Sequence, residues 1–166
     1  MRLRPYFGKL DYKYVEQWVN DERTHALWCA GLLPWPLTEE AMEAFLEKDG
    51  KEWGGFAYMA TEDDGKPVGF FIYSVNVEEN SGFLKFIVLD RELRGKGYGV
   101  QMIKLALKYA FDITGVESVQ LNVFQGNRAA MRCYEKAGLT VRRIDENAYQ
   151  YGDEQWTRCN MVIERQ

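Results

Sequence analysis

The sequence predicts an α+β domain in which helices flank a mixed β-sheet. One apolar run, a helix-like segment and a second apolar run follow one another between Phe83 and Phe124, as in two parallel strands joined by a crossover helix. Two β-rich runs flank the turn formed by Asp63, Asp64 and Gly65, which predicts an antiparallel hairpin. The chain has 166 residues and no low-complexity tract, so we expect residues 1–166 to be a single domain.

The first part of the chain is expected to supply one strand and two helices. Arg2 to Tyr6 can form a strand, and Asp11 to Asn20 has apolar residues at helical spacing. A second helix should begin after Thr38, because threonine is a favourable N-cap and Glu39 and Glu40 suit the positive end of a helix.

The middle of the chain is expected to build the sheet. Its strands should be Phe56 to Thr61, Pro67 to Val77 and Phe83 to Leu89. A long helix from Tyr98 to Thr114 then precedes the strand from Val119 to Phe124.

The C-terminal part should add a helix and a terminal pair of strands. We expect the helix over Asn127 to Ala137 and the strands over Leu139 to Ile144 and Gln155 to Ile163. The polar stretch from Glu146 to Gly152 is expected to be the loop between these strands.

Composition excludes several classes of function. The net charge of −4 argues against a general nucleic-acid-binding role, and no apolar run approaches the roughly 20 residues that span a bilayer. We therefore expect a cytoplasmic protein without nucleic-acid or membrane partners. Cys29, Cys133 and Cys159 are odd in number and lack zinc-site spacing, so free thiols and no metal are expected. The only histidine, His25, lies four residues from Cys29, but no acidic residue accompanies this pair to suggest a nucleophile.

The segment from Arg94 to Gly99 is the strongest functional signal. Its glycines alternate, it follows a strand and it opens a helix. Backbone N–H groups, the helix N-terminus and the side chains of Arg94 and Lys96 can therefore converge on an anion, and phosphate is the expected ligand. The alternative is an ordinary flexible turn at a helix start.

Spacing narrows the identity of the phosphate ligand. The glycines do not follow the dinucleotide fingerprint, and no Lys-Ser or Lys-Thr pair completes a P-loop. The pattern Arg94, Gly97 and Gly99 instead resembles the pyrophosphate loop of the GCN5-related N-acetyltransferases, the GNAT family. Cations nearby suit a ligand with several phosphates, although we expect Lys104, Lys108 and Arg132 to be solvated.

A second segment downstream also resembles this family. A strand is followed by Asn127, Ala130, Tyr134 and Gly138 at the family's spacing, with Leu139 where the family usually has phenylalanine. Asn127 can cap the helix, Tyr134 lies two turns along it, and Gly138 can end it.

The resemblance implies a fold and an activity. It implies a mostly antiparallel central sheet with a splayed parallel strand pair and helices on both faces. It also implies that acetyl-CoA is the cosubstrate and that a primary amine, a protein N-terminus or a small molecule such as a polyamine, amino acid or antibiotic, attacks it directly. The N-terminal part looks like the branch of ribosomal-protein N-terminal acetyltransferases. A monomer or a homodimer is expected.

The resemblance also implies roles for individual residues. Tyr134 is the expected general acid to the departing thiolate, and the backbone of Leu89 the expected oxyanion contact. The residues themselves, rather than the resemblance, suggest a base: Glu79 near a strand end is the candidate, with Glu78, Asp90 or a water relay as alternatives, although such carboxylates are commonly solvated. The Trp- and Pro-containing segment between the first two helices places Trp28 and Trp35 at an acceptor pocket, or packed against the sheet. The expected cosubstrate contacts are Ile87, Leu89, Arg94, Gly95, Lys96, Gly97, Tyr98, Gly99, Asn127 and Tyr134.

The alternative function is that of a binding module rather than an enzyme. The same fold can serve as a non-catalytic module that binds acyl-CoA and regulates a partner. Tyr134 at its motif position favours the enzyme, because a binding module does not need a proton donor for a thiolate.

Overall fold

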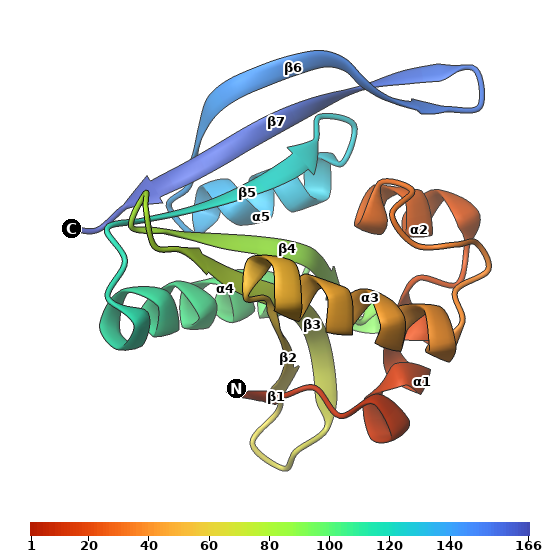
Figure 1. The fold of residues 1–166 in the computed structure, drawn as a ribbon, viewed down its shortest axis with the longest axis horizontal. Coiled ribbons are helices and arrows are strands. Elements are labelled where there is room, and N and C mark those ends of the chain that lie inside the picture. The colour runs from red at the N-terminus through yellow and green to blue at the C-terminus, as the bar shows by residue number, and fades with distance from the viewer.

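The structure, a computed structural model, describes residues 1–166 and is built on one seven-stranded sheet in the order β1-β2-β3-β4-β5-β7-β6 (Figure 1). The strands are β1 (Arg2–Pro5), β2 (Phe56–Thr61), β3 (Pro67–Asn76), β4 (Ser81–Leu89), β5 (Ser118–Phe124), β6 (Thr140–Tyr151) and β7 (Glu154–Glu164). Neighbouring strands are antiparallel except for β4 and β5, which are parallel. The predicted fold class is therefore confirmed.

Five α-helices cover the two faces of this sheet. They are α1 (Gly8–Trp18), α2 (Glu22–Cys29), α3 (Glu39–Trp53), α4 (Tyr98–Tyr109) and α5 (Arg128–Lys136), with a short 3₁₀ turn over Arg91–Leu93 and a π-helical turn over Ala110–Thr114 that extends α4. Figure 1 shows α3 crossing in front of the sheet and the β6–β7 hairpin along the top.

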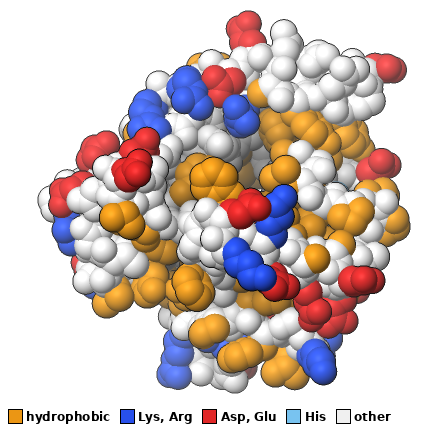
Figure 2. Space-filling model, viewed as in Figure 1, with side chains coloured by type: hydrophobic (Ala, Val, Ile, Leu, Met, Phe, Trp, Pro, Cys, Tyr) orange, Lys and Arg blue, Asp and Glu red, His pale blue; other side chains and the backbone are white.

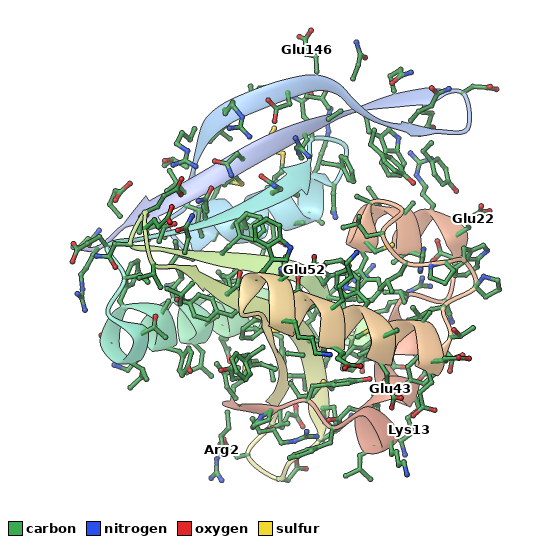
Figure 3. The ribbon with its side chains drawn as sticks, viewed as in Figure 1. Arg2, Lys13, Glu22, Glu43, Glu52 and Glu146 are labelled. Carbon is green, nitrogen blue, oxygen red and sulfur yellow. The ribbon has the colours of Figure 1, made fainter.

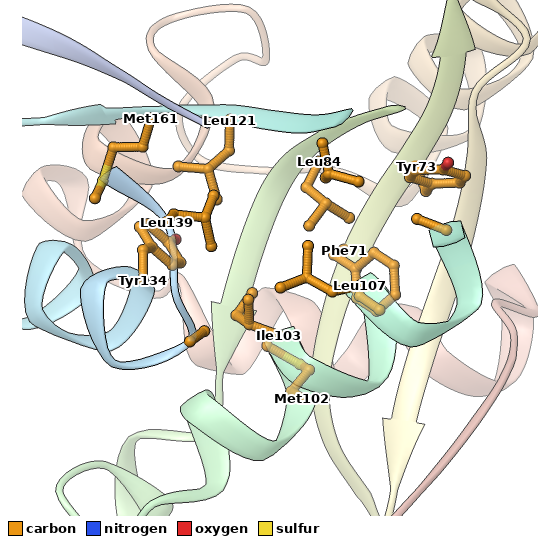
Figure 4. Packing of buried hydrophobic residues seen from close by; sticks show 14 of the residues in the cluster. Phe71, Tyr73, Leu84, Met102, Ile103, Leu107, Leu121, Tyr134, Leu139 and Met161 are labelled. Atoms are coloured by element: carbon orange, nitrogen blue, oxygen red, sulfur yellow. The ribbon is translucent and has the colours of Figure 1, made fainter. Parts of the chain in front are cut away.

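Alternation along β3 divides the apolar core into two clusters. Because successive strand residues point to opposite faces, Phe71 and Tyr73 join one cluster while Phe70 and Ile72 join the other. The first cluster packs against α4 and α5, and Figure 4 shows it from close by. The second packs against α1, α2 and α3. The sheet is thus a middle layer between two helical layers.

Local capping signals lie where the sequence predicts them. Thr38 Oγ1 accepts a hydrogen bond from the N–H of Ala41 at 3.2 Å, and Asn127 Oδ1 accepts one from the N–H of Ala130 at 3.3 Å. Gly138 has a φ of +105° and ends α5. These three predictions are confirmed, and the last two fix where α5 begins and ends.

The helix α2 is absent from the sequence prediction, which expects a loop between the first two helices. Asp21 Oδ1 accepts a hydrogen bond from the N–H of Thr24 at 2.8 Å and caps the helix. Asp21 itself is the local signal that could have revealed it, because aspartate is a favourable N-cap. The helix is only eight residues long, too short for a clear apolar periodicity.

The expected loop over Glu146 to Gly152 is wrong for most of its length. Strand β6 continues to Tyr151, and only Gly152 and Asp153 form the turn into β7. A bulge with Asn147 at a φ of +51° lies within it. The strand is at the edge of the sheet and largely exposed, so its residues are polar and resemble a loop in sequence.

Charged side chains such as Arg2, Lys13 and Glu146 point away from the body of the protein (Figure 3). None of its helices combines the length and the apolar character that crossing a membrane requires.

Candidate active site

The parallel strands β4 and β5 separate part of the way along their length. Their pairing extends from Ser81 opposite Ser118 to Leu84 opposite Leu121 and then ends. Two residues later, Phe86 has a φ of +53°, and the register between β3 and β4 shifts at the same place. This bulge bends β4, because an extra residue in one strand increases its local curvature. A wedge opens between the two strands.

Aromatic contacts hold the bulge in its unusual conformation. Trp28 Nε1 on α2 donates a hydrogen bond to the carbonyl of Phe86 at 2.8 Å. The ring of Phe86 packs 5.3 Å from that of Trp28 and 4.8 Å from that of Phe45 on α3, between ring centroids. Two helices, α2 and α3, therefore fix the backbone of β4 just beyond the point where the strands part.

A pocket of about 400 Å³ occupies the wedge, and we call it the wedge pocket. Residues from four parts of the chain line it: Thr24, Leu27 and Trp28 of α2; Lys85, Phe86, Ile87, Val88 and Leu89 of β4; Arg94, Gly95, Gly97, Gly99, Val100, Met102 and Ile103 of the glycine loop and α4; and Asn122, Val123, Asn127, Ala129, Ala130, Arg132, Cys133, Tyr134 and Lys136 from β5 to α5. Both sequence motifs therefore meet in a single pocket.

The glycines of the loop are needed for two different reasons, backbone conformation and close packing. Gly95 and Gly97 have φ values of +74° and +87°, a region that residues with a side chain rarely adopt. A Cβ atom at either position would contact nothing within 4 Å, so their requirement is conformational. At Gly99 a Cβ atom would lie 3.0 Å from Cys133 Sγ, so this glycine permits close packing of α4 on α5.

Most of the predicted cosubstrate residues lie in the wedge pocket, and two lie outside it. Those that line the pocket are Ile87, Leu89, Arg94, Gly95, Gly97, Gly99, Asn127 and Tyr134. Lys96 is exposed and does not line it, while the Tyr98 hydroxyl donates to Glu62 Oε1 at 2.8 Å. The side chains of Lys96 and Tyr98 therefore lie outside the wedge pocket.

Tyr134 extends from α5 into the core beside the wedge, next to Leu139 in Figure 4. The residue is 6% exposed, and its hydroxyl forms no hydrogen bond within the protein. Burial raises the pKa of Tyr134 above the ordinary tyrosine value. The phenol therefore stays protonated at neutral pH and is available as a donor.

The carboxylates considered as bases lie elsewhere. Glu79 is exposed in the turn between β3 and β4, where its N–H donates to Asn76 Oδ1 at 3.2 Å, and Glu78 lies beside it. This turn is at the Ser81 end of β4, whereas Leu89 is at the other end. Neither these residues nor Asp90 line the wedge pocket.

All charged residues that line the wedge pocket are cations. They are Lys85, Arg94, Arg132 and Lys136. Arg132, which we expected to be a solvated helix-face charge, is among them, and Lys136 is absent from the sequence prediction. On the molecular face in Figure 2, by contrast, acidic and basic side chains are interspersed.

The histidine and cysteine pair does not form a reactive site. His25 and Cys29 are both buried, with Sγ 3.5 Å from Nδ1. Burial lowers the pKa of His25 and raises the pKa of Cys29, which favours the neutral form of both. Neither His25 nor Cys29 lines the wedge pocket. Trp35, which we expected at an acceptor pocket, packs against the ring of His25 and does not line the wedge pocket either. No group of three or more His, Cys, Asp and Glu side chains is placed to hold a metal ion.

A splayed parallel strand pair with a glycine loop at one strand end defines a class of proteins that bind phosphate-containing ligands between strands. The chain belongs to the acetyltransferase (GNAT) family, whose model matches residues 11–139. The family expected from the two sequence motifs is confirmed.

Curated relatives acetylate small amines according to their names. The chain is 28% identical over 152 residues to spermidine N(1)-acetyltransferase of Escherichia coli K12, covering 85% of this chain and 73% of that protein. It is 24% identical over 141 residues to aminoglycoside N(6')-acetyltransferase type 1 of Klebsiella pneumoniae, covering 78% and 69%. The match spans only 61% of an uncharacterized N-acetyltransferase of Methanocaldococcus jannaschii and 54% of a prophage-derived one of Bacillus subtilis.

A solved structure shares the fold. The spermidine N-acetyltransferase of Vibrio cholerae in complex with CoA and spermine superposes with a TM-score of 0.82. The likeness covers 98% of this chain and 94% of that chain at 18% identity. It extends the family's fold over the whole length of the chain.

Proposed function

We propose that this protein is an N-acetyltransferase that transfers the acetyl group of acetyl-CoA to a primary amine on a small molecule. The observation that carries the proposal is the wedge pocket, which the glycine loop and Tyr134 line together. Membership of the GNAT family supports the reaction class, and the named relatives support a small amine as acceptor. Residues 1–166 would act as one catalytic domain.

The cosubstrate would lie along β4 and end at the glycine loop. The N–H groups from Arg94 to Gly99 and the N-terminus of α4 would hold the pyrophosphate, assisted by the guanidinium of Arg94. Lys96 and Tyr98 would contribute through their backbone, since their side chains lie outside the pocket. The backbone of Ile87 and Leu89 would contact the pantetheine arm, with Asn127 on the opposite wall.

The transfer would occur in one direct step between two bound substrates. The amine nitrogen attacks the thioester carbonyl, a new C–N bond forms, and the C–S bond breaks with its electron pair on sulfur. Tyr134 gives its proton to that thiolate and regains one from the amide nitrogen through water. The backbone N–H of Leu89 would stabilise the negative oxygen of the tetrahedral intermediate.

Proton removal from the amine is assigned to a water relay. We do not assign it to Glu79, because that side chain is at the far end of β4 and outside the pocket. A relay is compatible with a pocket lined by cations and no carboxylate, since cations nearby lower the proton affinity of an amine.

Other readings are less supported by these observations. A peptide N-terminus, as in the ribosomal-protein branch, is the alternative acceptor, but the relatives reported above are named for spermidine and aminoglycosides. A non-catalytic acyl-CoA-binding module would not need the Tyr134 hydroxyl in the pocket. We retain a cytoplasmic location, which three free cysteines favour, and a monomer or homodimer as parts of the proposal.

Release of the CoA thiol from acetyl-CoA across a panel of amines tests this function. Tyr134→Phe should lower kcat by about 100-fold or more, because a general acid contributes about that much. Its stability should match that of the unmodified protein, since the hydroxyl has no hydrogen-bond partner to lose. The matched control is Tyr14→Phe on α1, outside the pocket.

Two results would count against the proposal. If amine-dependent release is the same in Tyr134→Phe, that residue is not the acid. If CoA binds but no amine of any class triggers release, the binding module is the better account.

A further inference from the structure

The two residues that follow the last paired positions of β4 and β5 are Lys85 and Asn122. Leu84 and Leu121 point into the cluster on the α4 side, so the next residue of each strand points to the α3 side. The ion pair of Lys85 with Asp49 on α3 agrees with this direction. Lys85 and Asn122 both line the wedge pocket, on the same side of the sheet and directly beyond the point where the strands part.

The side chain of Lys85 is held in place by Asp49, whose carboxylate lies outside the wedge pocket. Asp49 is buried, does not line the wedge pocket, and accepts a hydrogen bond from Lys85 Nζ through Oδ1. An ammonium has three N–H donors, and those not used by Asp49 have no acceptor in the protein. The ion pair thus fixes the position of a cation whose remaining donors are free.

The orientation of Asn122 follows from a chain of hydrogen bonds that begins at Arg142. A guanidinium only donates, so Asn160 must present Oδ1 to Arg142 Nε, at 2.9 Å. The Nδ2 group of Asn160 then donates to Asn122 Oδ1, at 3.0 Å. Asn122 must therefore turn its own NH₂ group away from Asn160, and that group has no acceptor in the protein.

Where the two strands part, the wedge pocket therefore presents an ammonium and an amide N–H on adjacent strands. This combination suits a carboxylate, whose two oxygens accept such bonds. A polyamine would find no counter-charge, because no aspartate or glutamate lines the pocket. In the adjoining depression beyond Leu27, Glu154 is already paired with Arg23.

We propose that the acceptor is an amine that carries a carboxylate, as a free amino acid does, and that Lys85 and Asn122 bind this carboxylate. The inference rests on the proposed acetyl transfer and specifies its substrate class. It separates this protein from relatives that are named for spermidine and aminoglycosides.

The test compares each amino acid with its own carboxamide, and both with spermidine, in the thiol-release assay. The acids should have a kcat/KM at least about tenfold higher than the amides, since a hydrogen bond to a charged group contributes about that factor or more. Equal rates for acid and amide, or a preference for spermidine, would overturn the inference.

Asn122→Asp is the sharpest variant. It keeps an oxygen for Asn160 but replaces the free N–H donors with a negatively charged oxygen beside Lys85. The acid-to-amide ratio of kcat/KM should fall at least about tenfold. Asn122 is exposed, so the variant should fold, and Lys104→Met on the exposed side of α4 is the control that should keep the ratio.

A second variant tests Lys85 without leaving a buried charge unpaired. Lys85→Met is combined with Asp49→Asn, because Asp49 alone would be a buried carboxylate without its partner. The double variant should also lose the preference for acids. If it keeps the preference, the ion pair is only structural and the inference is wrong.

Failure of the two proposals can be distinguished by calorimetric titration with CoA. If CoA does not bind and no amine is acetylated, the proposed function fails and the inference falls with it. If CoA binds and amides or polyamines are acetylated as well as acids, only the inference fails. If CoA binds but no carboxylate-bearing amine is bound or acetylated, the inference is likewise overturned.

Discussion

Phe86 shows how a single residue shapes the site. A bulky side chain at positive φ is strained by roughly 1–2 kcal/mol, so the surrounding contacts must hold it there. The hydrogen bond from Trp28 and the packing of Phe45 supply these contacts. The strain is located where β4 leaves β5, which makes the opening of the wedge depend on α2 and α3.

Replacing Trp28 should therefore weaken both stability and transfer. Trp28→Phe removes the donor and leaves the Phe86 carbonyl buried without it, a loss of about 1–3 kcal/mol. Urea unfolding measures this change, and the transfer rate should fall because the bulge loosens. Trp53→Phe, at a side chain that is 67% exposed, should change stability by less than about 0.5 kcal/mol. Equal stability of the two variants would show that Phe86 does not depend on Trp28.

In the loop between β4 and α4, the effect of backbone conformation can be tested separately from the effect of steric contact. Gly97 has positive φ and an open surrounding, so Gly97→Ala introduces backbone strain without a clash. We expect a loss of roughly 1–2 kcal/mol of stability, and at least about a fivefold rise in the Kd for CoA as the N–H groups turn away. Calorimetric titration measures the Kd.

Gly115→Ala is the matched control for this prediction. Gly115 has a φ of +73° and is likewise open, but it ends the π-helical turn and does not line the wedge pocket. It should lose a similar amount of stability and keep the Kd for CoA. A similar rise in Kd for both variants would mean that general destabilisation, not the loop, controls binding.

The sequence predicts elements well where a local rule decides them. Thr38, Asn127 and Gly138 act through hydrogen bonds and φ values within a few residues, and all three predictions are confirmed. The polar edge strand β6 is misjudged as a loop, because its exposure depends on its place in the sheet. The short helix α2 is missed because eight residues carry little periodicity.

In the candidate site, too, local patterns could be predicted from the sequence and tertiary contacts could not. The residues of the two motifs could be placed because they carry a known spacing, and most of them line the wedge pocket. Glu79 lies outside the pocket because it precedes β4, whereas the glycine loop follows the opposite end of that strand, at Leu89. The pairing of Lys85 with Asp49 joins residues 36 positions apart and is visible only in three dimensions.

At the scale of the whole molecule, α2 links the stability of one helical layer to the pocket. The helix carries Trp28 into the wedge, and its buried His25 packs against the rings of Trp28 and Trp35. Protonation of His25 would place a charge among these rings, away from water. Burial lowers the pKa of His25 below its ordinary value of 6.5.

Stability should therefore fall as the solution is acidified. The unfolded chain binds a proton at His25 near the ordinary value, whereas the folded chain binds it only at lower pH, so unfolding is favoured as pH decreases through this window. The free energy of unfolding should begin to decline as the pH falls below about 7, above the range in which ordinary carboxylates titrate. Since His25 is the only histidine, His25→Phe should flatten this slope even if it changes stability at neutral pH. If the slope persists in His25→Phe, other groups cause the pH dependence of stability, and α2 does not contribute to it.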